Sequence, residues 1–195
     1  MPRSNASTAV RFVYTPPTLN GQLFTSDFLL KRITELPIWQ QIDAALFSQF
    51  KASLSARYSV LNWASALNEA QTEDELIEPV LNLLGWQDCL ISQVNLSEKG
   101  REDVPDYMLF DTPTRKASAL KLDDFSRAKF AVALLEAKRW TRPLDRADDA
   151  KRETRKKLDF SAPSSQMLRY LSRADVMSDG KLKWGVLSNG VLFRP

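Results

Sequence analysis

Apolar positions in residues 26–68 recur with the spacing of a helix. One stripe repeats every four residues and consists of Ile42, Leu46, Phe50 and Leu54. We expect this region to be a helical extension that packs against the rest of the domain. Residues 1–21 precede it with three prolines and several Ser, Thr and Asn residues, a composition typical of a loose tail. One short extended piece is expected at residues 10–14.

A second helix is predicted to begin at about Thr72 and to end after Leu83 and Leu84. Thr72 followed by Glu75 matches a capping box, and the same turn carries further acidic residues, which favour a helix N-terminus. Gly85 follows two leucines and is placed to end the helix.

Three apolar stretches then indicate strands, at residues 89–96, 104–110 and 130–138. The last is apolar on both faces, which is typical of a central strand. The polar stretch between the last two, residues 115–129, is predicted to be a hairpin or a short helix.

The chain is predicted to continue with a charged helix at about residues 144–158 and another at about 164–176. Asn189-Gly190 is a strong hairpin signal, so residues 184–187 should pair with residues 191–194. Helices alternating with strands over 195 residues predict one α/β domain.

The composition limits which kinds of catalytic and metal site the chain can form. The chain has 44% hydrophobic and 26% charged residues and a net charge of +3, which is ordinary for a globular protein and compatible with a polyanionic partner. It has no histidine, which excludes Ser-His and Cys-His nucleophile pairs and His-ligated zinc. The single cysteine, Cys89, lies in apolar surroundings and is interpreted as a small buried side chain. No apolar run is long enough to span a membrane, so we expect a cytoplasmic protein that binds no membrane.

The end of the strand at residues 130–138 carries the candidate chemistry. Glu136 and Lys138 lie on the same face of this strand, roughly 6 to 7 Å apart. If the strand at residues 104–110 is its neighbour, Asp106 points into the same cleft. Two adjacent carboxylates favour a cation between them, and Mg²⁺ prefers oxygen ligands. We expect Asp106, Glu136 and the carbonyl of Ala137 to bind Mg²⁺, and Lys138 to orient a water or steady a phosphate.

Pro105-Asp106 followed by Glu136-Ala137-Lys138 resembles the motif of the PD-(D/E)xK nucleases. In that superfamily the Asp and the ExK acid hold Mg²⁺, with Mn²⁺ as a substitute, and the lysine assists hydrolysis of a phosphodiester. The resemblance therefore implies a metal-dependent phosphodiester hydrolase.

The order of elements extends this resemblance. Gln166 and Tyr170 are four residues apart on one helical face, similar to the QxxxY signature of some branches. "NEAQTEDELIEPVLNLLGW" resembles the first helix of type I restriction subunits and of type IIG enzymes, which fuse nuclease and methyltransferase. "LLEAKRWTRPLDR" and "SAPSSQMLRYLSRADVMSDGKLKWGVLSNGVLFR" resemble the IIG nuclease region.

These families imply a restriction-endonuclease-like core at residues 69–195, with a central mixed β-sheet flanked by helices and a helical extension at residues 22–68. A glutamate of the first helix contributes to the site, and Glu69 fits best, Glu73 second; Glu75 is assigned as a capping residue. The implied partners are double-stranded DNA and methyltransferase and target-recognition domains in the same or a partner chain. The separation of Asp106 from Glu136 is wider than in compact members, which implies an insertion.

The candidate site residues also have non-catalytic interpretations. Glu136 and Lys138 also fit a surface ion pair, and Asp106 fits a turn former. Gln166 and Tyr170 fit a solvated glutamine and a half-buried tyrosine. The basic stretch at residues 139–157 fits either a solvated helix face or a track for phosphates. The alternative functions are a non-catalytic DNA-binding module with the same fold and a recombination or repair nuclease.

Overall fold

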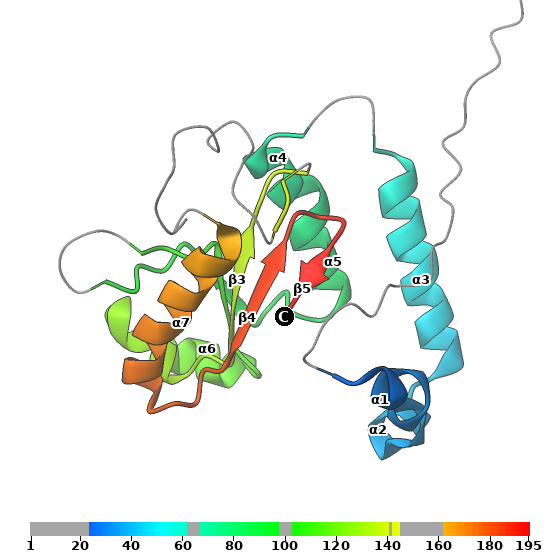
Figure 1. The fold of residues 1–195 in the computed structure, drawn as a ribbon, viewed down its shortest axis with the longest axis horizontal. Helices are drawn as coiled ribbons and strands as arrows, with labels where there is room; N and C mark the ends of the chain where they lie inside the picture. Colours follow the sequence, from blue (N-terminus) through cyan, green and yellow to red (C-terminus); the bar gives the residue numbers. More distant parts are fainter. Residues whose placement is uncertain (1–23, 62–66, 98–102, 141, 145–161) are drawn as a thin grey trace, which may run out of the picture. The chain divides into compact units, whose positions relative to one another are not determined.

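The computed structural model describes residues 24–61, 67–97, 103–140, 142–144 and 162–195 (Figure 1). The chain forms two units, Met1–Ser48 and Gln49–Pro195. The predicted extended piece at residues 10–14 and nearly all of the charged helix predicted at 144–158 lie outside the described residues.

The region predicted to be helical is helical as far as residue 59. Its elements are α1 (Ser26–Leu30), η1 (Arg32–Glu35), α2 (Pro37–Gln40) and α3 (Ala44–Ser59). Thr25 caps α1 by accepting a hydrogen bond from the backbone N–H of Phe28. No residue of α3 is buried, and within the apolar stripe Leu46 is exposed and Phe50 half-buried. The packing of this stripe against the rest of the domain stays a prediction.

The second predicted helix is present but begins earlier than its expected cap. It runs through α4 (Glu69–Thr72), a π-helical segment η2 (Glu73–Ile77) and α5 (Glu78–Leu83). Asn68 and Gln71 form the capping box, because each side chain accepts a hydrogen bond from the other's backbone N–H. The predicted Thr72 and Glu75 capping box was wrong, since the Asn68 pair caps the helix one turn earlier. Gly85, at φ +86°, ends the helix as predicted.

Five strands form one mixed sheet in the order β1-β2-β3-β4-β5. Their bounds are β1 (Leu90–Ser92), β2 (Tyr107–Leu109), β3 (Ala133–Ala137), β4 (Trp184–Ser188) and β5 (Phe193–Arg194). Only β3 and β4 are parallel; the other neighbouring pairs are antiparallel. The strands are shorter than predicted, but β3 is central, as its two apolar faces indicated. Helices α6 (Pro113–Ala119) and η3 (Phe125–Lys129) connect β2 to β3, which confirms the helical alternative for residues 115–129.

The core lies on both faces of the sheet. Even-numbered side chains such as Met108 and Leu134 pack against Tyr170 and its neighbours on α7 (Pro163–Ser178). Odd-numbered side chains such as Leu135 pack on the other face against Ile77 and its neighbours in η2 and α5. Helices therefore cover both faces of a mixed sheet in Figure 1, an α/β arrangement.

The C-terminal hairpin pairs as predicted, although its loop is longer. Leu187 lies opposite Arg194 and Ser188 opposite Phe193, so four residues connect β4 to β5. Asn189 Oδ1 accepts hydrogen bonds from two backbone N–H groups within this loop. Cys89 is buried, also as predicted.

Candidate active site

Asp106 and Glu136 occupy facing positions on neighbouring strands. Tyr107 of β2 lies opposite Leu135 of β3 in the antiparallel register, so the next pair along the strands is Asp106 and Glu136. Oδ2 of Asp106 also accepts a hydrogen bond from the backbone N–H of Ala137 at 2.6 Å. A shared cleft required these two strands to be neighbours, and they are, although 29 residues separate the two acids along the chain.

Lys138 connects Glu136 to Glu69 of α4. Its Nζ lies 2.5 Å from Oε1 of Glu136 and 3.1 Å from Oε1 of Glu69. Its backbone N–H donates to the carbonyl of Ser188 in β4 at 2.7 Å, which fixes where the side chain leaves the sheet. The Glu136 and Lys138 side chains are only 4% and 12% exposed, so their contact is not the surface ion pair of the non-catalytic interpretation.

The two acids hold more negative charge than one lysine neutralises. Burial raises the pKa of Glu136 to about 7, and the neighbouring Asp106 adds to the increase. Burial also raises the pKa of Asp106, although the N–H of Ala137 and the charge of Lys138 act against it. Oε2 of Glu136 is buried and, within the part of the chain that is described, receives no hydrogen bond. This end of the sheet therefore favours an additional proton or cation.

Lys138 remains an ammonium group in these surroundings. Burial alone would lower its pKa, but Glu136 and Glu69 outweigh burial and raise it. The side chain can therefore donate hydrogen bonds and supply positive charge, but it is a poor base near neutral pH.

Glu69 and Glu73, the two glutamates predicted as site candidates, both interact with the charges of this site. Glu69 forms the ion pair with Lys138, and Glu73 lies one turn further on. Burial raises the pKa of Glu73 to about 7, with further increases from Asp106 and Glu69. Glu75 is not a capping residue; it lies within the π-helical segment, a deviation that is frequent at functional sites.

Gln166 and Tyr170 hold the chain next to Asp106. Nε2 of Gln166 donates to the Tyr170 hydroxyl at 2.6 Å, and this hydroxyl donates to the carbonyl of Val104 at 3.2 Å. Burial raises the pKa of Tyr170, as does the charge of Glu136. The structure thus brings Glu69, Asp106, Glu136, Lys138, Gln166 and Tyr170 to one end of the sheet.

The donor set suits a hard cation bound through two carboxylates. Mg²⁺ is commonly held by one or two carboxylates and completed by waters. The uncompensated Oε2 of Glu136, the raised pKa of both acids and the end of β3 at Ala137 are compatible with such a ligand. Across the described ranges, no group of three or more acidic or cysteine side chains has the arrangement of a metal site.

Sequence reasoning missed two contacts that support the cluster. Oγ1 of Thr72 accepts a hydrogen bond from the backbone N–H of Trp140 at 3.0 Å, which ties α4 to the segment after Lys138. Asp103, only 1% exposed, pairs with Arg169 and Arg173 of α7. The two arginines are four residues apart, a spacing that could have indicated a shared partner.

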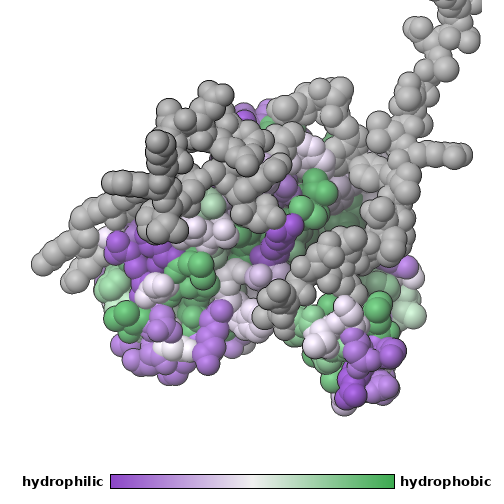
Figure 2. All heavy atoms as spheres, viewed as in Figure 1, coloured by the Kyte–Doolittle hydropathy of each residue, from purple (hydrophilic) through white to green (hydrophobic). Residues whose placement is uncertain are grey.

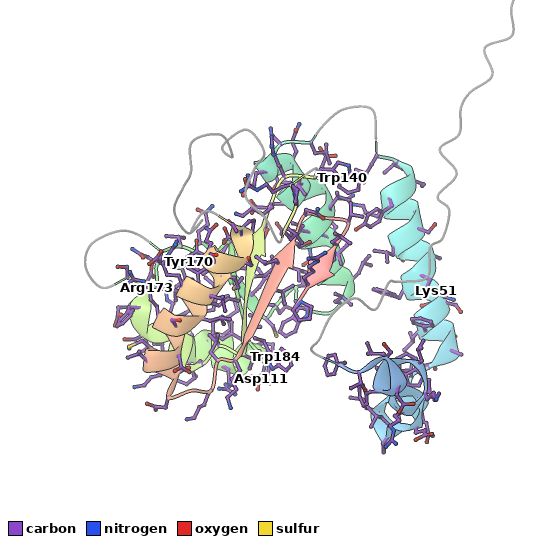
Figure 3. The ribbon with its side chains drawn as sticks, viewed as in Figure 1. Lys51, Asp111, Trp140, Tyr170, Arg173 and Trp184 are labelled. Carbon is purple, nitrogen blue, oxygen red and sulfur yellow. The ribbon has the colours of Figure 1, made fainter. Side chains whose placement is uncertain are left out.

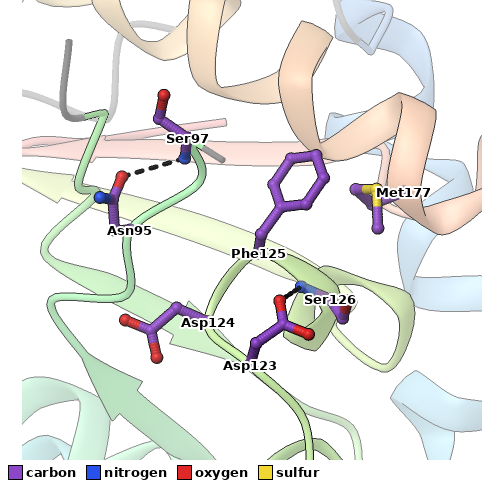
Figure 4. Close-up of a pocket in the computed structure, with 7 residues that line it drawn as sticks. All are labelled: Asn95, Ser97, Asp123, Asp124, Phe125, Ser126 and Met177. Atoms are coloured by element: carbon purple, nitrogen blue, oxygen red, sulfur yellow. Dashed lines mark hydrogen bonds between the residues drawn. The ribbon is translucent and has the colours of Figure 1, made fainter. Parts of the chain in front are cut away.

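A separate pocket of about 540 Å³ lies away from these residues (Figure 4). Its lining comes from the loop after β1, the start of η3 and Met177 of α7. Asn95 and Asp123 each accept a hydrogen bond from a backbone N–H in this pocket. None of the six predicted site residues lines it.

A scan against models of protein families found no match to this chain, and searches of curated proteins and of solved structures found none. None of the described helices is long and apolar enough to cross a membrane.

Proposed function

We propose that this protein is a Mg²⁺-dependent DNA endonuclease domain that hydrolyses phosphodiester bonds. The observation that carries the proposal is the juxtaposition of Asp106, Glu136 and Lys138: a half-buried and a buried acid at facing positions of neighbouring strands, with an ammonium group 2.5 Å from Glu136. The excess negative charge and the uncompensated Oε2 of Glu136 support a bound divalent ion.

Each residue has a distinct role in this proposal. Asp106 and Glu136 would hold Mg²⁺, which, when bound, supplies positive charge to the phosphate and lowers the pKa of a water. Lys138 donates a hydrogen bond that orients the attacking water or a phosphate oxygen. Glu69 positions the Lys138 ammonium through their contact at 3.1 Å.

Gln166 and Tyr170 act on the backbone. Their hydrogen bonds to each other and to Val104 fix the short segment that leads into Asp106. We assign them as positioning residues, because they form hydrogen bonds with one another and with the main chain.

The restriction-modification assignment is a finer part of the same proposal. It rests on the resemblance of the stretches around Glu69, Glu136 and Gln166 to type IIG and type I enzymes, and on a mixed sheet flanked by helices that is compatible with a restriction-endonuclease-like core. Double-stranded DNA is the proposed substrate, and methyltransferase and target-recognition domains in the same or a partner chain are the proposed partners.

Metal-dependent nicking of supercoiled plasmid tests the proposal. The wild-type chain should nick plasmid with Mg²⁺ or Mn²⁺ and not with EDTA. Lys138→Ala should lower the rate by about 100-fold or more, since it removes an oriented charge at the reacting phosphate. Lys129→Ala removes an exposed lysine of η3 and should leave the rate unchanged.

Undiminished cleavage by Lys138→Ala, with a normal circular dichroism spectrum, would remove this mechanism. DNA binding without metal-dependent cleavage by the wild type would instead favour the alternative of a non-catalytic DNA-binding module.

A further inference from the structure

Asp103 is a buried carboxylate held by two arginines of α7. Nε of Arg169 donates to Oδ1 of Asp103 at 2.7 Å, and Nε of Arg173 pairs with Oδ2. The Asp103 side chain is 1% exposed, whereas those of Arg169 and Arg173 are 34% and 38% exposed. These three side chains carry a net charge of +1, and the two arginines, not the aspartate, are exposed to solvent.

Two arginines exceed what this carboxylate requires. A single guanidinium can satisfy a carboxylate with two parallel hydrogen bonds. Here each arginine contacts Asp103 through Nε, and a guanidinium has five N–H donors. Within the described residues, no second carboxylate pairs with Arg169 or Arg173. Asp103 therefore orients two forked donors whose positive charge it only half neutralises.

This group adjoins the candidate active site. Asp103 lies three residues before Asp106, and Arg169 is next to Tyr170. An open pocket of about 340 Å³ is lined by Arg169, Leu168 and two serines of α7. Tyr170 and Arg173 both project from α7 in Figure 3, and hydrophilic and hydrophobic residues lie side by side over α7 in Figure 2.

We propose that Arg169 and Arg173, oriented by Asp103, form a binding site for the phosphates of a DNA strand beside the candidate active site. The inference rests on the proposed function, because it assigns the backbone contacts of the same substrate. Four residues of helix separate the two arginines by about 6 Å along its axis. One DNA strand carries a phosphate about every 3.4 Å of helix axis, so the pair can contact nearby phosphates of one strand. Such contacts position DNA without reading its sequence.

Salt-dependent binding of a short fluorescent duplex, measured by anisotropy with EDTA present, tests this site. Arg169→Gln and Arg173→Gln should each weaken binding by about tenfold, and over about 50–200 mM salt each should reduce the slope of log K against log salt by about 0.9. Arg115→Gln is the matched control: Arg115 is 38% exposed and pairs with Asp111, which lies at the opposite end of the sheet from Trp140 (Figure 3). It should change neither quantity.

Arginine-specific modification of the wild-type chain gives a second readout if a variant fails to fold. Duplex DNA should protect Arg169 and Arg173 from phenylglyoxal, while Arg115 reacts equally with and without DNA. An unchanged salt slope in folded variants, absence of duplex binding by the wild type, or no protection would overturn the site. Because EDTA prevents metal-dependent cleavage, these results are independent of the nicking assay, whose failure alone would remove the hydrolytic function.

Discussion

At the scale of single residues, the candidate site is defined by carboxylates that are costly to ionise. Glu73 and Glu136 both have a pKa raised to about 7, in each case first by burial and then by Asp106. Lys138 offsets part of this cost and, among the described carboxylates, forms ion pairs with Glu136 and Glu69. The sequence indicated which acids would meet, but burial, which sets their pKa, depends on the packing of α4, η2 and α7 around them.

The raised pKa of Glu73 has a consequence for stability. The folded chain keeps the Glu73 proton up to about pH 7, while the unfolded chain loses it near the ordinary glutamate pKa of 4.5. The native state therefore binds more protons in this window, so the contribution of Glu73 to stability falls as the pH rises from 4.5 to 7.

Glu73→Gln should remove this penalty. We expect the variant to raise the free energy of unfolding by on the order of 1 kcal/mol at about pH 8, after allowance for solvent screening, and by much less near pH 4. Urea unfolding at both pH values, without divalent metal, measures the difference. Glu35→Gln, in η1 of the first unit, controls for the loss of one charge. Equal effects at the two pH values would contradict the raised pKa of Glu73.

At the scale of elements, the central strand and the C-terminal hairpin were predictable, but the exact ends of the elements and the π-helical segment were not. The apolar run of β3 predicted its central position, and Asn189-Gly190 predicted the hairpin. The helix formed by α4, η2 and α5 begins one turn before its expected cap. Asn68 and Gln71 form there the reciprocal hydrogen bonds that were predicted for Thr72 and Glu75. The π-helical segment had no local signal; its Leu76 and Ile77 are fully buried, which indicates that tertiary packing stabilises it.

The loop between β4 and β5 packs at Gly190 against Thr72 of α4 and Leu76 of η2. The φ of Gly190 is +82°, and a Cβ there would lie 2.7 Å from Cδ1 of Leu76 and 3.1 Å from Cγ2 of Thr72. The Tyr58 hydroxyl also donates to the carbonyl of Gly190. A side chain at this position would push the hairpin away from the helix that carries Glu69.

Gly190→Ala should therefore destabilise the chain more than Gly85→Ala. Gly85 has a similar φ of +86° but open space around it, so alanine there meets only the backbone cost of about 1–2 kcal/mol. Gly190→Ala adds the steric overlap and should cost about 1–3 kcal/mol more. Urea midpoints of the two variants provide the comparison. Equal losses would show that the hairpin does not pack tightly on Leu76.

At the scale of the whole molecule, the topology assembles a site from four distant segments. Glu69 comes from α4, and Asp106 directly precedes β2. Glu136 and Lys138 come from the C-terminal end of β3, and Tyr170 comes from α7. The sequence indicated part of this grouping, because Glu136 and Lys138 alternate on one face of a strand and Asp106 was predicted to lie on the neighbouring strand. The spacing of Arg169 and Arg173 is compatible with a shared partner, but its identity as Asp103 had to be observed, since nothing in a sequence states which helix face covers a given loop.

Binding of Mn²⁺ by calorimetry tests most directly whether these segments form a cation site. The wild-type chain should bind Mn²⁺ through Asp106 and Glu136 with release of protons, and binding should weaken as the pH falls below about 7 because protons compete for the same oxygens. Glu136→Gln should lower the affinity at least tenfold, whereas Asp111→Asn, an exposed carboxylate elsewhere in the fold, should not. Absence of binding by the wild type, or equal binding by Glu136→Gln, would contradict the account.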